Sequence, residues 1–97
     1  MLDHYVMLKI KPKCKGDLPE IVRQLEGLQR DIPAIQFAEV MVDEMHGPHS
    51  FDVMFHIRVA DARAFREDYM PHQKHIPVQR YIEARVCGIA DMDMTLQ

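Results

Sequence analysis

The 97-residue chain lacks an excess of positive charge, because 12 lysine and arginine residues face 15 aspartate and glutamate residues. The resulting net charge is −3 with histidine neutral. A protein that binds nucleic acid through its phosphates needs a basic face. The one basic cluster, LKIKPKCK, is interpreted as a solvated strand end and loop. We therefore expect no nucleic-acid partner.

Cysteine and long apolar runs are also scarce. Cys14 and Cys87 are the only cysteines, and two isolated cysteines do not imply a disulfide framework. No apolar run approaches the roughly 20 residues of a membrane-spanning helix. The opening MLDHYVMLKI lacks the charged segment and continuous apolar core of a signal peptide. We expect a cytoplasmic protein that does not bind membranes.

What remains is the composition of a globular protein, with 47% hydrophobic and 28% charged residues. The length predicts a single domain over residues 1–97. A domain of this size buries only about 60–65% of its unfolded surface, so a partner subunit would add useful burial.

Strand patterns alternate with helix patterns along the chain. The segments DHYVMLKIK, IQFAEVMVDE and FDVMFHIRV alternate side chains as strands do, and a fourth strand is expected from about Val86 to Met94. Apolar residues recur at helical spacing between Asp17 and Pro33, where Asp17 and Glu20 predict a capping box. The segment DARAFREDYM predicts a second helix capped by Asp61, before Pro71 and Pro77.

The order β-α-β-β-α-β predicts an α+β, ferredoxin-like domain with an antiparallel four-stranded sheet and helices on one face. The opposite face would carry side chains that are too apolar to remain in water, namely Tyr5, Met7, Phe37, Met41, Met54 and His56. The simplest cover for this face is a second copy, which predicts a homodimer that closes as a two-fold α/β barrel.

The chain resembles the stress-responsive A/B barrel domain family. The resemblance rests on HYVMLKIK, LEGLQRDIPAIQFAEV, SFDVMFHIRVADARAFREDYMPHQKH and the aspartate of GIADMD. The family pattern of a tyrosine and two histidines, each three residues apart, matches Tyr69, His72 and His75, and an early strand histidine matches His4. The resemblance implies a dimeric barrel. The family also includes a plant polyketide cyclase, whose catalytic residues would correspond to His75 and Tyr69.

We identify His75, Tyr69 and His4 as candidate catalytic residues and His72 and Phe65 as candidate ligand contacts. A histidine with a pKa near neutrality can remove a proton beside a carbonyl group, and a tyrosine hydroxyl can stabilise the resulting enolate. An apolar cavity between the sheet and the second helix would bring these groups together around a small apolar or polyketide-like ligand. This chemistry needs no cofactor.

Two other interpretations remain open at this stage. The same residues could serve structure alone, with the space near His75 filled by side chains such as Phe65, Ile76 and Tyr81, in a ligand-binding or protective dimer without catalysis. A metal could use the pair His72 and His75 or the pair His46 and His49, but neither pair has an obvious third ligand nearby. We therefore predict no metal, and the sequence leaves open whether the protein is an enzyme.

Overall fold

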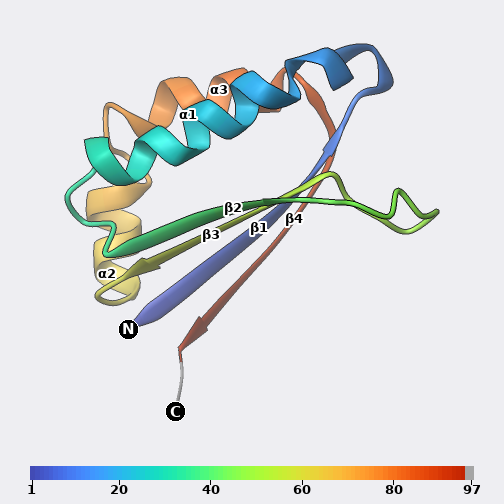
Figure 1. The fold of residues 1–97 in the computed structure, drawn as a ribbon. Coiled ribbons are helices and arrows are strands. Elements are labelled where there is room, and N and C mark those ends of the chain that lie inside the picture. Colours follow the sequence, from blue (N-terminus) through green and yellow to red (C-terminus); the bar gives the residue numbers. More distant parts are fainter. Residues whose placement is uncertain (96–97) are drawn as a thin grey trace.

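The computed structural model describes residues 1–95 and shows one antiparallel sheet with its helices on one face (Figure 1). The strands follow the order β2-β3-β1-β4 across the sheet, so β1 and β3 are central. Their bounds are Leu2–Ile10 for β1, Phe37–Val42 for β2, Val53–Val59 for β3 and Val86–Thr95 for β4. The predicted βαββαβ order and the four-stranded antiparallel sheet are thus confirmed.

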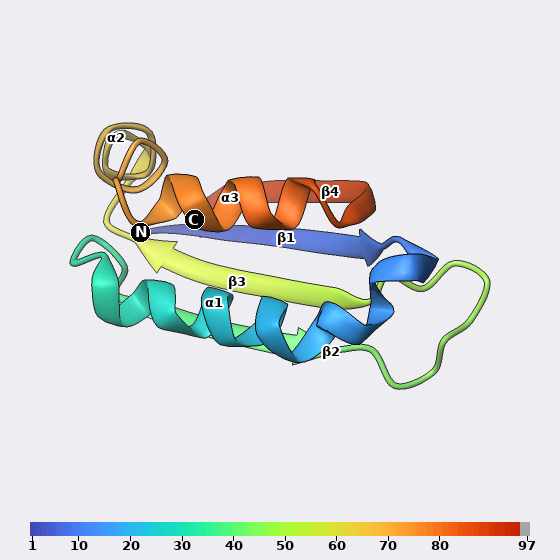
Figure 2. The same ribbon diagram turned by 90° about the horizontal axis from the view of Figure 1, so that it is seen from above.

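The helices form the second layer. α1 lies over the β2–β3 side of the sheet, α3 over the β1–β4 side, and α2 stands at one end (Figure 2). The helical segments are the 3₁₀ helix η1 (Pro12–Asp17), α1 (Leu18–Asp31), α2 (Ala62–Ala64), the π-helical turn η2 (Phe65–Tyr69) and α3 (His75–Glu83). None of the helices within residues 1–95 has the length and apolar character needed to cross a bilayer.

The core lies between the helices and the inner face of the sheet. Alternate residues of β3 point into it, and all four are at most 2% exposed: Val53, Phe55, Ile57 and Val59. The buried stripe of α1 covers them with residues one helical turn apart, namely Ile21, Leu25 and Leu28. Strand alternation and helical spacing therefore identified the core correctly from the sequence.

The start of α1 differs from the prediction. The expected capping box is wrong, because the Asp17 side chain accepts a hydrogen bond from Arg85 Nε at 3.1 Å and Glu20 pairs with Arg23 and Gln24. The chain enters α1 from η1, and the Leu18 amide already donates to the Lys15 carbonyl. With backbone groups partly paired in this way, the side chains are free to form other contacts.

The helical region after β3 is irregular. Asp61 caps α2 as predicted, since its side chain accepts a hydrogen bond from the Ala64 amide at 2.8 Å. The chain then widens into η2, where the Met70 amide donates to the Phe65 carbonyl at 3.0 Å, a spacing of five residues. Pro77 lies inside the first turn of α3 rather than before the helix, a position where a missing amide proton does no harm.

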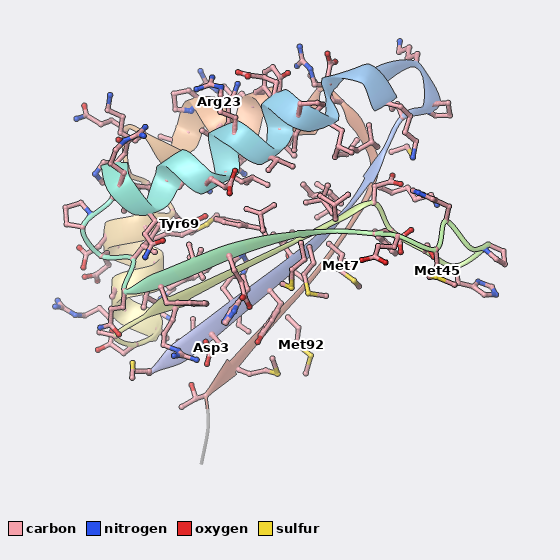
Figure 3. The ribbon with its side chains drawn as sticks, in the orientation of Figure 1. Asp3, Met7, Arg23, Met45, Tyr69 and Met92 are labelled. Atoms are coloured by element: carbon pink, nitrogen blue, oxygen red, sulfur yellow. The ribbon has the colours of Figure 1, made fainter. Side chains whose placement is uncertain are left out.

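The outer face of the sheet carries the predicted apolar residues. Strand register places Tyr5 beside His56 and Met92, and Met7 beside Met54. The labelled Met7 and Met92 point away from the helix layer (Figure 3). Several large apolar side chains on this face are substantially exposed in the single chain: Met92 at 61%, Phe37 and Met41 at 39% each and Met94 at 37%.

Candidate functional site

A cavity of about 310 Å³ lies between α3 and the inner face of β1 and β4. Its walls are mainly apolar, with residues such as Val6, Leu28, Val78 and Ile82. Three polar aromatic side chains also line it: His4 from β1, Tyr69 from the end of η2 and His75 from the start of α3. The three predicted catalytic residues therefore share one cavity, together with Phe65.

One ring nitrogen of His75 forms a hydrogen bond within the protein, and the other is available to a ligand. Its Nδ1 lies 2.9 Å from the Met70 carbonyl oxygen, which can only accept, so Nδ1 carries the proton and donates. The other nitrogen, Nε2, is then an acceptor. Burial, opposed by the bond to Met70 and assisted by nearby His4, lowers the pKa of His75 below 6.5. The ring is therefore neutral at neutral pH, as a general base must be.

Tyr69 is packed against His75. Their ring centroids are 4.5 Å apart, and the tyrosine residue is only 2% exposed. Within residues 1–95 the Tyr69 hydroxyl has no hydrogen-bond partner. Every side-chain polar atom that is fully buried in this range does have a partner, so the hydroxyl is not fully buried. The hydroxyl therefore reaches the open space of the cavity. Burial raises the pKa of Tyr69 well above its usual value, so the group remains a hydrogen-bond donor.

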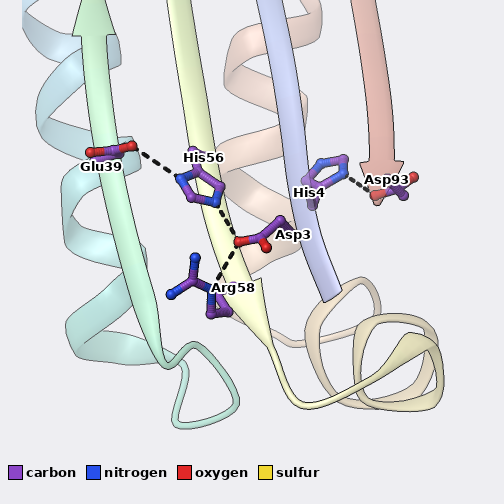
Figure 4. Close-up of polar contacts among 6 residues, drawn as sticks. All are labelled: Asp3, His4, Glu39, His56, Arg58 and Asp93. Atoms are coloured by element: carbon purple, nitrogen blue, oxygen red, sulfur yellow. Dashed lines mark hydrogen bonds and ion pairs between the residues drawn. The ribbon is translucent and has the colours of Figure 1, made fainter. Parts of the chain in front are cut away.

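His4 is oriented by an aspartate on the neighbouring strand. Its Nδ1 lies 2.6 Å from Asp93 Oδ1, across the β1–β4 pair (Figure 4). The carboxylate accepts, so Nδ1 carries a proton and donates. The His4 ring lies 4.7 Å from Phe65 and 6.4 Å from Tyr69, measured between ring centroids. Phe65 thus helps to fix His4 from the side of η2.

Exposed carboxylates line the same cavity and were missed as site residues. Asp91 and Asp93 come from β4, and Glu83 comes from the end of α3. The sequence contained a signal for the first two, because Ile89, Asp91 and Asp93 alternate along β4 and so must share its inner face. Glu83 gave no such signal.

The structure does not bring His72 to this cavity. His72 lies in the turn between η2 and α3, beside a shallow hollow that also includes Pro33 and Pro71. Its Nδ1 accepts a hydrogen bond from the Lys74 amide at 3.0 Å, and its carbonyl accepts from the amides of His75 and Ile76. His72 therefore shapes the entry into α3.

The side chains that could have filled the cavity do not all do so. Phe65 lines it, whereas Ile76 and Tyr81 are not among its lining residues. Ile76 is 36% exposed, and the Tyr81 ring packs under the Arg85 guanidinium at 3.6 Å. Space is therefore left between α3 and the sheet.

His46 and His49, the second histidine pair considered for a metal, lie outside the cavity. His46 and His49 are in the loop between β2 and β3, where the His46 amide donates to Asp43 at 2.7 Å. Over residues 1–95, no three His, Cys, Asp or Glu side chains gather as a possible metal site.

A second polar group lies on the outer face of the sheet. His56 is 3% exposed, and its two ring nitrogens lie 2.7 Å from Asp3 Oδ1 and 3.1 Å from Glu39 Oε1 (Figure 4). Arg58 Nε also donates to Asp3, at 2.9 Å. The bonds from His56 and Arg58 hold the pKa of Asp3 below its usual value in spite of burial.

Comparison with known proteins identifies relatives of this fold. The sequence model of the family described as "Stress responsive A/B Barrel Domain" matches residues 2–96. No curated protein matches the chain.

Among solved structures, a dimeric ferredoxin-like protein from Thermobifida fusca has a TM-score of 0.86 at 14% identity, over 98% of this chain and 90% of that chain. A Dabb family protein from Mesorhizobium loti has a TM-score of 0.81 at 15% identity, over 99% and 96%. Hydroxynitrile lyase from Passiflora edulis has a TM-score of 0.83 at 13% identity, over 99% and 93%. At such identities these likenesses establish the ferredoxin-like fold.

Proposed function

Since the chain belongs to the stress responsive A/B barrel domain family, we propose that each subunit binds a small carbonyl compound in the cavity and acts on it as a cofactor-free acid–base catalyst. One observation carries the proposal. A neutral histidine with a free acceptor nitrogen and a tyrosine with an unpaired hydroxyl line the same largely apolar space.

The reaction class follows from these two groups. His75 Nε2 removes a proton from the carbon beside the carbonyl group, and the electron pair of that bond moves onto the carbonyl oxygen. The Tyr69 hydroxyl donates a hydrogen bond to the enolate oxygen. The enolate then attacks a second carbonyl group to close a ring, as in a polyketide cyclase, or a lyase-type reaction breaks a neighbouring bond. His4, oriented by Asp93, is placed to exchange the second proton.

The fold is compatible with this type of chemistry, because a protein of the same fold from Passiflora edulis is a hydroxynitrile lyase. The alternative is a ligand-binding or protective structural dimer without catalysis. It is favoured by the hydrogen bond from His75 to Met70 and by the helix-entry contacts of His72, which give both histidines a structural role.

A general-base probe separates these alternatives without knowledge of the substrate. In 5-nitrobenzisoxazole, a base removes the ring C–H proton, the N–O bond breaks, and a nitrile and a coloured phenolate form. The protein should open this ring faster than free imidazole at the same concentration. The reason is that the base, and the hydroxyl that donates a hydrogen bond to the forming phenolate, are already in place. If the ring opens no faster with protein than with imidazole, the protein lacks the proposed base.

The pH dependence of that reaction gives a second prediction. Only the neutral form of His75 accepts a proton, and burial lowers its pKa below 6.5. The rate should therefore rise with pH and reach half of its plateau below pH 6.5, at lower pH than for free imidazole. Measuring the initial rate across the pH range checks this, and a midpoint above 6.5 would contradict it.

We further propose that the outer face pairs with a second copy to form a homodimer. The neighbour from Thermobifida fusca is described as dimeric. On this chain the same face exposes Phe37, Met41, Met92 and Met94. Exposed apolar side chains of this size are unfavourable in water, and the adaptable methionine side chains can pack against their counterparts.

Met92→Glu should weaken this dimer by at least about tenfold in dissociation constant, because each glutamate would be desolvated among apolar side chains. Met92 is 61% exposed in the single chain, so the substitution leaves the core intact. Met45→Glu is the matched control, since Met45 is 83% exposed in the β2–β3 loop, away from the sheet face. Sedimentation equilibrium measures both. Equal dissociation constants for the two variants would argue against this interface.

A further inference from the structure

We propose that the cavity selects its ligand by charge, accepting uncharged or cationic compounds and rejecting carboxylates and phosphates. This inference rests on the proposed function, because it assumes that the cavity is the ligand site. It narrows the substrate class to a carbonyl compound without an anionic group near the reacting end.

The evidence lies in the residues at the mouth. Four exposed residues line the cavity and so mark its opening: Glu83, Ile89, Asp91 and Asp93. Three of the four are acidic, and among the described residues no lysine or arginine lines the cavity. A ligand that enters must therefore pass acidic side chains, with no lysine or arginine in the lining to balance a negative charge on the ligand.

The acidic side chains are only partly paired. Asp93 accepts from His4, and Glu83 accepts from Gln79 Nε2 at 2.9 Å. Asp91 forms no ion pair with any residue in the range 1–95. It stands opposite Val6 in the β1–β4 pair, two residues from Asp93 and therefore on the same face.

Two basic side chains at the C-terminal end of α3 are engaged outside the cavity. Arg85 contacts Asp17 through Nε and the Tyr81 carbonyl through Nη1. Lys11 Nζ donates to the Ala84 carbonyl at 3.2 Å. Neither side chain lines the cavity, so neither offers a direct ion pair to a ligand there.

The interior of the cavity indicates that a ligand belongs there. The Tyr69 residue is 2% exposed, yet its hydroxyl lines the cavity without a partner in the described chain. Such a donor is satisfied by a neutral acceptor such as a carbonyl oxygen. An anionic ligand could also use this donor, but it would have to bring its charge close to Asp91, Asp93 and Glu83 in a partly dry space, where like charges repel more strongly than in water.

Three matched probes test the role of charge. They are 4-methylacetophenone, which is neutral, 4-acetylbenzoate, which is anionic, and 4-(aminomethyl)acetophenone, which is cationic. All share an aryl methyl ketone and differ at the opposite end of the ring. Dissociation constants come from NMR titrations that follow the His75 and Tyr69 ring signals. We expect the anion to bind at least about tenfold more weakly than the neutral ketone, and the cation to bind at least as tightly.

Two double variants test whether the weaker binding of the anion comes from the carboxylates at the mouth of the cavity. In Glu83→Gln/Asp91→Asn, the disadvantage of the anion should fall to about threefold or less, since two of the carboxylates are gone. The control Glu67→Gln/Asp68→Asn makes the same change in net charge beside the hollow near His72, and it should leave the order unchanged. Raising the salt concentration from roughly 0.01 M to 1 M should also reduce the difference in the natural protein.

The outcomes separate the two proposals. If all three ketones shift the His75 and Tyr69 signals but the anion binds as tightly as the neutral probe, the charge inference is wrong and the ligand site stands. The charge inference is also wrong if both double variants change the order equally, because the effect is then one of net charge. If no probe shifts those signals, the cavity does not bind aryl ketones, and the ligand site and the charge inference fail together.

Discussion

His75→Ala should lower the rate of 5-nitrobenzisoxazole opening at least about 100-fold, because a positioned general base contributes roughly 10²–10⁴-fold to such a step. The His75 ring is the neutral base of the cavity, and its Nε2 is the nitrogen not used by Met70. Alanine removes that nitrogen from the cavity. Initial rates at saturating and subsaturating probe show whether the loss lies in the chemical step or in binding.

His72→Ala is the control for this experiment. It removes an imidazole three residues away that lies outside the cavity, so the rate should change less than about threefold if the base is His75. Circular dichroism and thermal melting of both variants establish that each is folded. A folded His75→Ala protein with the rate of the natural protein would remove the proposed catalytic role, whatever the cavity binds.

Phe55→Ala should lower the free energy of unfolding by about 3–5 kcal/mol, the range for a fully buried phenylalanine. Phe55 is 1% exposed in the central strand β3, where it faces the helices and also lines the cavity. Its removal loses apolar burial and leaves a void that the rigid strand cannot close. Because small domains have only about 5–15 kcal/mol of total stability, this loss is a large share.

Phe37→Ala is the matched substitution on the other face. Phe37 is 39% exposed on the edge strand β2, and it contacts the ring of His56 and the Arg58 guanidinium. At protein concentrations low enough to dissociate a dimer, we expect Phe37→Ala to lose less than about 1.5 kcal/mol, since 39% of the residue is still exposed to water. Urea unfolding of both variants makes the comparison. Equal losses would mean that the packing inside the helix–sheet interface is not as tight as the burial of Phe55 implies.

The fold could be predicted from the sequence because its signals are local and periodic. Val53, Phe55 and Ile57 alternate along one strand, and Ile21, Leu25 and Leu28 repeat along one helix, so each pattern identifies the buried side directly. The capping box at Asp17 failed for a different reason. Its partner, Arg85, is distant in sequence and becomes available only when the chain has folded.

The candidate site could be predicted only in part. Tyr69, His72 and His75 are spaced as on one helix face, but the helix is interrupted after Met70, and the turn directs His72 elsewhere. The partnership of His4 with Asp93 depends on the β1–β4 register, which a single sequence does not contain. The acidic mouth depends on the same register together with the position of α3.

The π-helical turn η2 has a consequence for how this site could be gained or lost. A turn closed across five residues contains one residue more than an α-helical turn, and one residue corresponds to about 100° of rotation about the helix axis. If the same residues were closed as an α-helical turn, Tyr69 would be rotated about the helix axis and would leave its present position in the cavity. The wide turn therefore sets the direction in which the tyrosine enters the site. Restoring α-helical hydrogen bonding there at constant chain length would change any activity that depends on the tyrosine.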